Sequence, residues 1–353
     1  MQRQQVKPNT IEIARLSRGK VQLELSEEVG IKQGTLSKIE SGLIIPNEDI
    51  IEKIAKSLNY PVAFFYEDIV IPPTFAIHYR KKKALDGLEL QKLQYKIYIL
   101  KHFVKKLTKA VNIKNNMFYL NPDEHGDPEE IATQIRLKWS IPRGPIKNLM
   151  SIVEAAGVIV LLVDYENDEI DGEVVPDENG MPFIYLNKNR PPDRIRFTLA
   201  HELGHLIMHT KDYIVSGVQA EDEANLFAGA FLAPSDDIRY QLDDNLSLAR
   251  LADLKRHWKM SMASLVKAAE RVGVESKKTK SLWVQLSKSG YRKKEPDLGI
   301  PYEHPTLVKQ IFDIYFDSLG YSIDDLASLV PLYKTEIRGI IDLYSNKTIR
   351  LMA

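Results

Sequence analysis

Two histidines stand four residues apart in the segment His201-Glu202-Leu203-Gly204-His205, with a glutamate directly after the first. Because an α-helix has about 3.6 residues per turn, positions i and i+4 share a face, so both imidazoles can reach one metal ion. Zinc accepts neutral imidazole nitrogen, and a catalytic zinc site keeps one position open for water. A carboxylate beside that water can act as a general base while the metal polarises a carbonyl. The motif therefore predicts Zn²⁺ ligands at His201 and His205 and a catalytic base at Glu202.

The residues around this motif predict a buried helix. Apolar side chains recur at helical spacing before and after it, at Phe197, Leu199, Ala200, Leu203, Leu206 and Ile207. Gly204 costs a helix about 1 kcal/mol relative to alanine, and we expect it to allow close backbone packing beneath the metal. The alternative is a core helix whose histidines only find hydrogen-bond partners, but two histidines and a glutamate are costly to bury unless they are paired.

A third metal ligand must come from another part of the chain. His209 lies eight residues after His201, about 12 Å along a helix axis, so we expect it beside the ligands or at the substrate rather than on the ion. A second segment of helical apolar period follows and offers Glu221 or Glu223. We favour Glu221, because Asn225 lies one turn further along the same face and can hydrogen-bond a metal-bound histidine. Glu223 remains the alternative.

The run R-F-T-L-A-H-E-L-G-H-L-I-M-H, followed by E-D-E-A-N-L-F-A-G-A-F-L-A-P, resembles the ImmA/IrrE family of zinc metallopeptidases over residues 144–234. The resemblance implies a zincin-like (gluzincin-type) fold, zinc on His201 and His205, and Glu202 as general base. It also favours Glu221 as the third ligand, and it implies endopeptidase action on a regulatory protein, often a DNA-bound repressor.

Two apolar segments before the motif, 158–163 and 182–187, are typical of buried strands. In the relatives, the strand that precedes the motif helix borders the cleft and takes up an extended peptide by strand addition.

Near the N-terminus, residues 21–30 and 31–42 predict two short helices, each closed by a glycine and joined by a tight turn at Gly30. Two helices joined in this way form a helix-turn-helix. Residues 1–68 resemble the XRE (Cro/repressor-like) helix-turn-helix family. The resemblance implies that the second helix enters the major groove of DNA and that one glutamine of the first helix contacts phosphate. The implied DNA-contacting residues, polar and on the outer side, are Gln22, Gln33, Thr35, Ser37 and Lys38.

This N-terminal segment departs from the XRE pattern in two ways. Gly34 replaces the bulkier residue usual near the start of the second helix, and Glu24, Glu27 and Glu28 make the preceding helix acidic. Because DNA affinity depends strongly on neutralising phosphates, these acidic residues oppose binding. The alternative to a DNA reader is a helical protein-docking module on the same scaffold.

The composition limits the remaining possibilities. The chain has 353 residues, a formal net charge of zero and no cysteine, so disulfides and thiolate zinc sites are excluded. The longest apolar run, 155–163, is far shorter than the roughly 20 residues that span a bilayer. Residues 1–5 lack the apolar core of a signal peptide. We expect a cytoplasmic protein that is not bound to a membrane.

The chain divides into four parts in this interpretation. They are an XRE-type helix-turn-helix domain (1–68), a linker and long helix (69–130), an ImmA/IrrE-like zinc metallopeptidase domain (131–290) and a helical C-terminal region (291–353). The expected fold class is mainly α with a small β-sheet (α+β).

Two functions remain open at this stage. The first is a zinc-dependent endopeptidase that uses its DNA-binding domain to reach a repressor or antitoxin-like regulatory protein, in stress response or in the control of phages and mobile elements. Its oxyanion needs a further donor, for which His209 and Tyr213 are candidates. The second is an XRE-family transcriptional regulator or antitoxin that binds DNA as a homodimer and carries a structural or sensory metal. Structural zinc usually has four protein ligands, and the sequence offers no convincing fourth.

Overall fold

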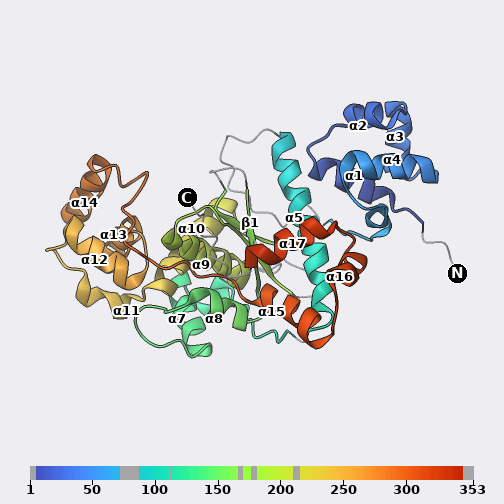
Figure 1. Cartoon of the computed structure of the whole chain (residues 1–353). Helices are drawn as coiled ribbons and strands as arrows, with labels where there is room; N and C mark the ends of the chain where they lie inside the picture. The colour runs from blue at the N-terminus through green and yellow to red at the C-terminus, as the bar shows by residue number, and fades with distance from the viewer. Residues whose placement is uncertain are drawn as a thin grey trace, which may run out of the picture. The chain divides into compact units, whose positions relative to one another are not determined.

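The computed structural model describes residues 5–71, 87–111, 113–165, 170–175, 181–209 and 215–344. Helices dominate these residues, and one small sheet accompanies them, which confirms the predicted α+β class (Figure 1). Contacts divide the chain into two compact units. The first comprises residues 1–74, 81–113 and 308–353, and the second comprises 75–80 and 114–307. The four sequence-based domain boundaries stay predictions.

The first unit contains the expected helix-turn-helix. Four short helices form its bundle: α1 (Pro8–Ser17), α2 (Gln22–Val29), α3 (Gln33–Glu40) and α4 (Glu48–Leu58). Gly30 ends α2 in the left-handed region, at φ 77°, where glycine carries no steric cost. Leu25, Leu36 and Ile39 are fully buried between the helices. A 3₁₀ turn, η1 (Val62–Tyr66), closes the bundle.

The remaining helices of this unit come from distant parts of the chain. They are α5 (Gly87–Thr108), α15 (Leu307–Asp313, which begins at the boundary between the units), the π-helical turn η4 (Ile314–Ser318), α16 (Ile323–Leu329) and α17 (Lys334–Tyr344). The long helix predicted within residues 69–130 corresponds to α5. The Tyr315 hydroxyl donates a buried hydrogen bond of 3.1 Å to the Leu107 carbonyl, which ties the C-terminal helices to the end of α5.

A three-stranded sheet lies in the second unit. The strands are β1 (Ile159–Val163), β2 (Gly172–Val175) and β3 (Phe183–Asn187), in the order β1-β3-β2. β3 is parallel to β1 and antiparallel to β2. The two strands predicted from apolar runs are confirmed, whereas β2 was not predicted.

This strand order corrects one expectation. The strand that precedes the motif helix is β3, and it lies in the middle of the sheet with neighbours on both sides. Its backbone groups are already used in ladders, so the expected addition of a peptide to this strand is wrong for this chain. Of the described strands, β2 is the edge strand on the side away from β1.

The described part of the second unit also contains ten helical segments. They are α6 (Pro122–His125), α7 (Pro128–Lys138), α8 (Leu149–Ala155), α9 (Pro192–Met208), α10 (Gly217–Leu232), α11 (Ser235–Ile238), the 3₁₀ turn η3 (Arg239–Gln241), α12 (Leu248–Trp258), α13 (Met262–Arg271) and α14 (Ser276–Lys288).

The motif helix α9 packs on one side against α10 and on the other against β2 and β3. It begins at Pro192, whose fixed φ suits a first helical turn. α10 begins after Ser216, whose side chain accepts a hydrogen bond from the Gln219 backbone N–H. α10 therefore starts at a side-chain cap, whereas α9 starts with proline and has no side-chain cap. Among the described residues, no helix combines the length and the apolar composition that crossing a membrane requires.

Candidate metal centre and DNA-binding surface

The helices α9 and α10 approach closely at Gly204. A Cβ atom placed on this glycine would lie 3.0 Å from Cδ1 of Phe227 and 3.4 Å from Cα of Ala224. Glycine is therefore what permits this backbone separation, which confirms the close packing expected beneath the motif. Because Glu221 lies one turn before Ala224 on α10, the crossing brings its carboxylate to the face of α9 that carries the two histidines.

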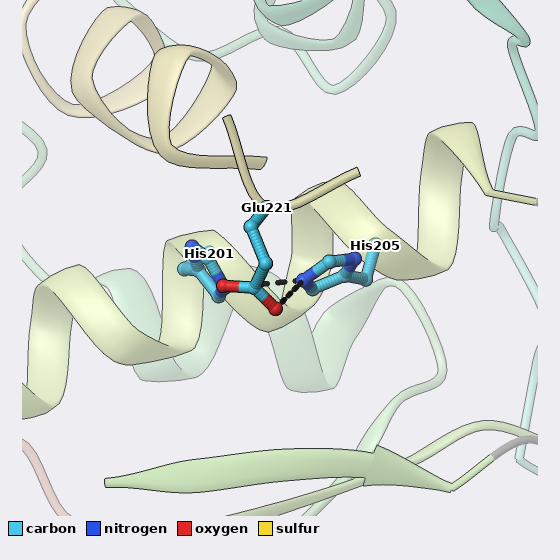
Figure 2. Close-up of side chains that lie close together, drawn as sticks. All are labelled: His201, His205 and Glu221. Carbon is cyan, nitrogen blue, oxygen red and sulfur yellow. Dashed lines mark hydrogen bonds and ion pairs between the residues drawn. The ribbon is translucent and has the colours of Figure 1, made fainter. Parts of the chain in front are cut away.

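Three ligand atoms converge between the two helices, as Figure 2 shows. Nε2 of His201 lies 3.1 Å from Nε2 of His205. The Glu221 carboxylate oxygens lie 3.5 Å and 3.4 Å from these two nitrogens. Atoms bonded to zinc at about 2.0–2.1 Å in a tetrahedron lie roughly 3.3–3.4 Å apart. Each Nε2 atom lies near this distance from the other and from one of the two Glu221 oxygens, so the three side chains fit a single zinc ion and leave a fourth position for another ligand.

Asn225 orients the imidazole ring of His201. Its Oδ1 lies 3.1 Å from Nδ1 of His201, and an amide oxygen only accepts hydrogen bonds, so Nδ1 carries the proton. The lone pair of the neutral ring is then on Nε2, the nitrogen that faces Glu221. Asn225, one helical turn after Glu221, therefore hydrogen-bonds a histidine of the predicted metal site, as its spacing in the sequence predicted.

A second chain of hydrogen bonds orients His205. Nε2 of His209 donates to Glu223 at 3.0 Å, which leaves Nδ1 of His209 to accept from Nδ1 of His205 at 2.8 Å. Nε2 of His205 is then the unprotonated nitrogen, as a metal ligand must be. The other Glu223 oxygen accepts from the Gln219 side chain at 2.8 Å. This geometry favours Glu221 over Glu223 as the third ligand and gives Glu223 a supporting role.

The burial of His205 sets its charge. His201 is 7% exposed and His205 is 3% exposed. Burial lowers the pKa of His205 to about 4, the hydrogen bond with Glu221 opposes this shift, and the neighbouring His201 and His209 add to it. His205 is therefore neutral near pH 7, which is the form that binds metal without first losing a proton.

A cleft of about 770 Å³ opens onto this centre. His201, Glu202 and Glu221 all line it, so the predicted base and the ligands face the same space. Residues 170–172, at the start of β2, and the segment that follows α14 also line it. A carboxylate beside a metal position and open to a cleft can receive a proton from water.

The predicted DNA-contacting residues lie together on the helix-turn-helix. Gln33 and Lys38 are exposed on α3, and Thr35 and Ser37 are half-buried beside them. The Gln33 side chain donates to Gln22 at 2.7 Å, so these two glutamines form one unit across α2 and α3.

A buried ion pair holds this surface in place, and sequence reasoning missed it. Arg15 of α1 binds both carboxylate oxygens of Glu40 at 2.6 Å and 2.9 Å. Glu40 also accepts from Gln22 at 2.7 Å, which connects the pair to the glutamines. In the sequence, Arg15 and Glu40 each stand at a helical position where the spacing of the neighbouring residues predicts an apolar side chain. Charged residues are rarely buried at such positions unless they are paired.

Residues 153–270 match the Peptidase_M78 family, described as the IrrE N-terminal-like domain, and residues 11–65 match a helix-turn-helix family. The chain joins an IrrE-like metallopeptidase domain to an XRE-type helix-turn-helix domain. No curated protein matches the chain. The two domains together support a DNA-binding, protease-like regulator. The IrrE-like domain supports a metallopeptidase-type enzyme that acts on protein.

Of the two residues predicted to stabilise the oxyanion, the structure describes only His209. Both ring nitrogens of His209 are engaged, with His205 and Glu223, and His209 is not among the described residues that line the cleft. Its geometry therefore favours support of a ligand over contact with substrate. Tyr213 lies outside the described residues.

The helix-turn-helix domain has little net charge with which to attract DNA. Residues 1–68 contain nine basic and ten acidic residues, a net charge of −1. Lys32 and Lys38 are nevertheless exposed on and beside α3, so the basic groups that remain lie close to the predicted reading surface. Any affinity for phosphate depends on this local arrangement rather than on a general field.

Proposed function

We propose that this protein is a zinc-dependent endopeptidase that uses its helix-turn-helix domain to bind DNA and that cleaves a transcriptional repressor or an antitoxin-like regulatory protein. The observation that carries the proposal is the convergence of His201, His205 and Glu221 at tetrahedral spacing beside a cleft that Glu202 lines. Among the described residues no fourth histidine, cysteine or carboxylate joins this cluster. An incomplete shell of this kind is typical of catalytic rather than structural zinc.

In this proposal His201, His205 and Glu221 hold the zinc, and Asn225 and His209 keep the two imidazoles in the ligating tautomer. Bound zinc supplies Lewis-acid polarisation of a carbonyl and makes water more acidic. Glu202 accepts the proton of the attacking water and delivers it to the amide nitrogen that leaves. Because the two transfers use the same carboxylate, loss of Glu202 removes both.

The edge strand β2 is the proposed docking site for the substrate backbone. Gly172, at the start of β2, lines the cleft together with His201 and Glu202. Of the described strands, only β3 pairs with β2, so an extended peptide can add to its other edge and reach the metal centre. A side chain at Gly172 would collide with the neighbouring strand β3, because a Cβ there would lie 2.6 Å from the Tyr185 carbonyl oxygen.

The test of the peptidase is the Glu202→Gln substitution, which removes the base but no ligand. Wild-type and variant protein, both loaded with zinc, are incubated with repressor proteins encoded near the gene, and fragments are identified by mass spectrometry. We expect equal zinc content and a loss of cleavage of at least about 100-fold in the variant. Glu275→Gln, an exposed residue outside the cleft, should cleave normally. Full cleavage by Glu202→Gln would contradict the assignment.

DNA binding is tested on the full chain with operator fragments in gel-shift experiments. Lys38→Gln should weaken binding and reduce its salt dependence, because it removes one exposed charge of the reading helix. If the protein binds zinc and DNA and no repressor is cleaved, the regulator with a non-proteolytic metal site replaces the proposed function. If no DNA shift occurs at low salt, the first domain is a protein-docking module.

A further inference from the structure

The cleft carries an excess of positive charge, although the whole chain is neutral. Apart from the metal cluster and Glu202, seven basic and four acidic side chains line it. The basic residues are Lys188, Arg190, Arg194, Lys255, Arg292, Lys293 and Lys294, and the acidic residues are Asp171, Asp193, Glu295 and Asp297. With Glu202 and Glu221 counted, the excess is one charge, and a bound divalent ion would return it to three.

Several of these charges already have partners within the protein. Lys255 is buried between Asp193 at 2.5 Å and Glu295 at 2.8 Å. Arg190 and Arg194 share the single carboxylate of Asp171, each at 2.7 Å. Lys188 pairs with Asp164 at 3.1 Å, so four of the seven basic residues lie beside carboxylates.

The unneutralised charge is concentrated in the run Arg292-Lys293-Lys294, which directly follows α14. All three residues are exposed. The Arg292 guanidinium lies over the Trp283 ring, 4.7 Å from its centroid. Lys293 and Lys294 form no ion pair with any residue that the structure describes.

The backbone under this run is fixed, so the charges are held in place. The backbone N–H groups of Lys293 and Lys294 donate to the Gly290 carbonyl at 3.1 Å and 3.2 Å. Glu295, the next residue, accepts from the backbone N–H groups of Met262 and Ala263 at 2.7 Å and 3.0 Å. A preorganised segment loses less entropy when it binds a ligand than a free loop does.

We propose that Arg292, Lys293 and Lys294 recognise aspartate or glutamate side chains of the peptide in the cleft, so that the substrate segment around the scissile bond is acidic. This inference rests on the proposed peptidase function and names its substrate class. Ammonium groups on flexible stems suit carboxylates in several positions, and a cleft lined by one sign of charge attracts the opposite sign.

The test measures peptide binding separately from cleavage. Zinc-loaded, full-length Glu202→Gln protein is titrated into three fluorescein-labelled octapeptides that differ only in carrying glutamate, glutamine or lysine at their variable positions. Fluorescence anisotropy should show the tightest binding for the glutamate peptide, with an affinity that falls as salt rises. Lys293→Gln/Lys294→Gln should weaken binding of the glutamate peptide roughly two- to twentyfold and leave the glutamine peptide unchanged.

A matched control uses Lys277→Gln/Lys280→Gln, which removes the same charge from exposed positions of α14 that do not line the cleft. This variant should bind all three peptides as the parent does. Equal affinity for the glutamate and glutamine peptides, or equal losses in both double variants, would overturn the inference. It is also overturned if Lys293→Gln/Lys294→Gln loses binding to a labelled DNA duplex and not to the glutamate peptide.

The inference and the proposed function fail in different ways. Charge-dependent binding of the glutamate peptide, without cleavage of any protein by the wild type, supports the basic cleft and its acidic ligand and contradicts the peptidase. Cleavage that depends on Glu202, without preference for acidic peptides, supports the peptidase and overturns the acidic substrate.

Discussion

Gly204→Ala places one methyl group at the crossing of α9 and α10. The added Cβ would lie 3.0 Å from Cδ1 and 3.3 Å from Cγ of Phe227. Phe227 is fully buried and stacks on Phe231 with a centroid separation of 5.4 Å. Its ring therefore cannot turn away without displacing a second buried ring, and the helices must separate by a few tenths of an ångström.

Two effects of opposite sign decide the stability of this variant. Replacing a helical glycine with alanine stabilises by about 1 kcal/mol, whereas overpacking a filled core costs roughly 1–3 kcal/mol. We therefore expect a net loss of about 0–2 kcal/mol in the free energy of unfolding. Metal binding should suffer more, because the displaced α10 moves Glu221 away from His201 and His205, and we expect zinc affinity to fall at least about tenfold.

Zinc affinity is measured by competition with a chromophoric chelator, and stability by urea denaturation of the metal-free protein. Gly339→Ala is the control, because an added Cβ there meets nothing within 4 Å. The control should gain up to about 1 kcal/mol of stability and bind zinc normally. If Gly204→Ala behaves like Gly339→Ala in both assays, the glycine does not set the helix separation.

His209→Ala removes the acceptor for Nδ1 of His205, so zinc affinity should fall about 10–100-fold in chelator competition. In metal-free protein, burial lowers the pKa of His205 to about 4, so the unfolded chain binds this proton more readily. This difference leaves the free energy of unfolding unchanged above about pH 6.5 and lowers it by up to about 3 kcal/mol as the pH drops to about 4. Urea denaturation across this pH range would measure the decrease. Arg15→Met leaves Glu40 buried without its cation and should cost about 3–5 kcal/mol, measured in the same way.

Each of these predictions has a matching control. Normal zinc affinity in His209→Ala would show that the ring of His205 is oriented without it. In His205→Gln, the decrease in the free energy of unfolding attributed to His205 should disappear. An unchanged pH profile would show that another group causes it. Arg15→Met/Glu40→Leu should recover most of the stability lost in Arg15→Met, because both charges are then removed.

The sequence predicted those parts of the site that depend on one helix alone. The four-residue spacing places His201 and His205 on the same face of α9, and helical phase also placed Asn225 near the centre. The choice between Glu221 and Glu223 depends on how α10 lies against α9. That arrangement follows from the crossing at Gly204, which periodicity alone does not reveal.

The remaining features escaped prediction because their sequences carry no periodic signal. β2 has four residues and begins at Gly172, too short for an alternating pattern to be distinguished from a loop. Residues 291–306 contain no regular element, although they contribute a wall of the cleft. The grouping of α15–α17 with the N-terminal helices depends on contacts across the chain, such as that of Tyr315 with Leu107.

The central claim is that zinc binds between α9 and α10 on His201, His205 and Glu221. The most direct measurement is metal analysis of the purified protein together with X-ray absorption at the zinc edge, on wild type and on Glu221→Gln and Glu223→Gln. The account predicts one zinc per chain, with nitrogen and oxygen ligands at about 2.0–2.1 Å, and weaker or altered coordination in Glu221→Gln than in Glu223→Gln. Wild-type protein that takes up no zinc, or the same coordination in wild type and Glu221→Gln, would contradict it.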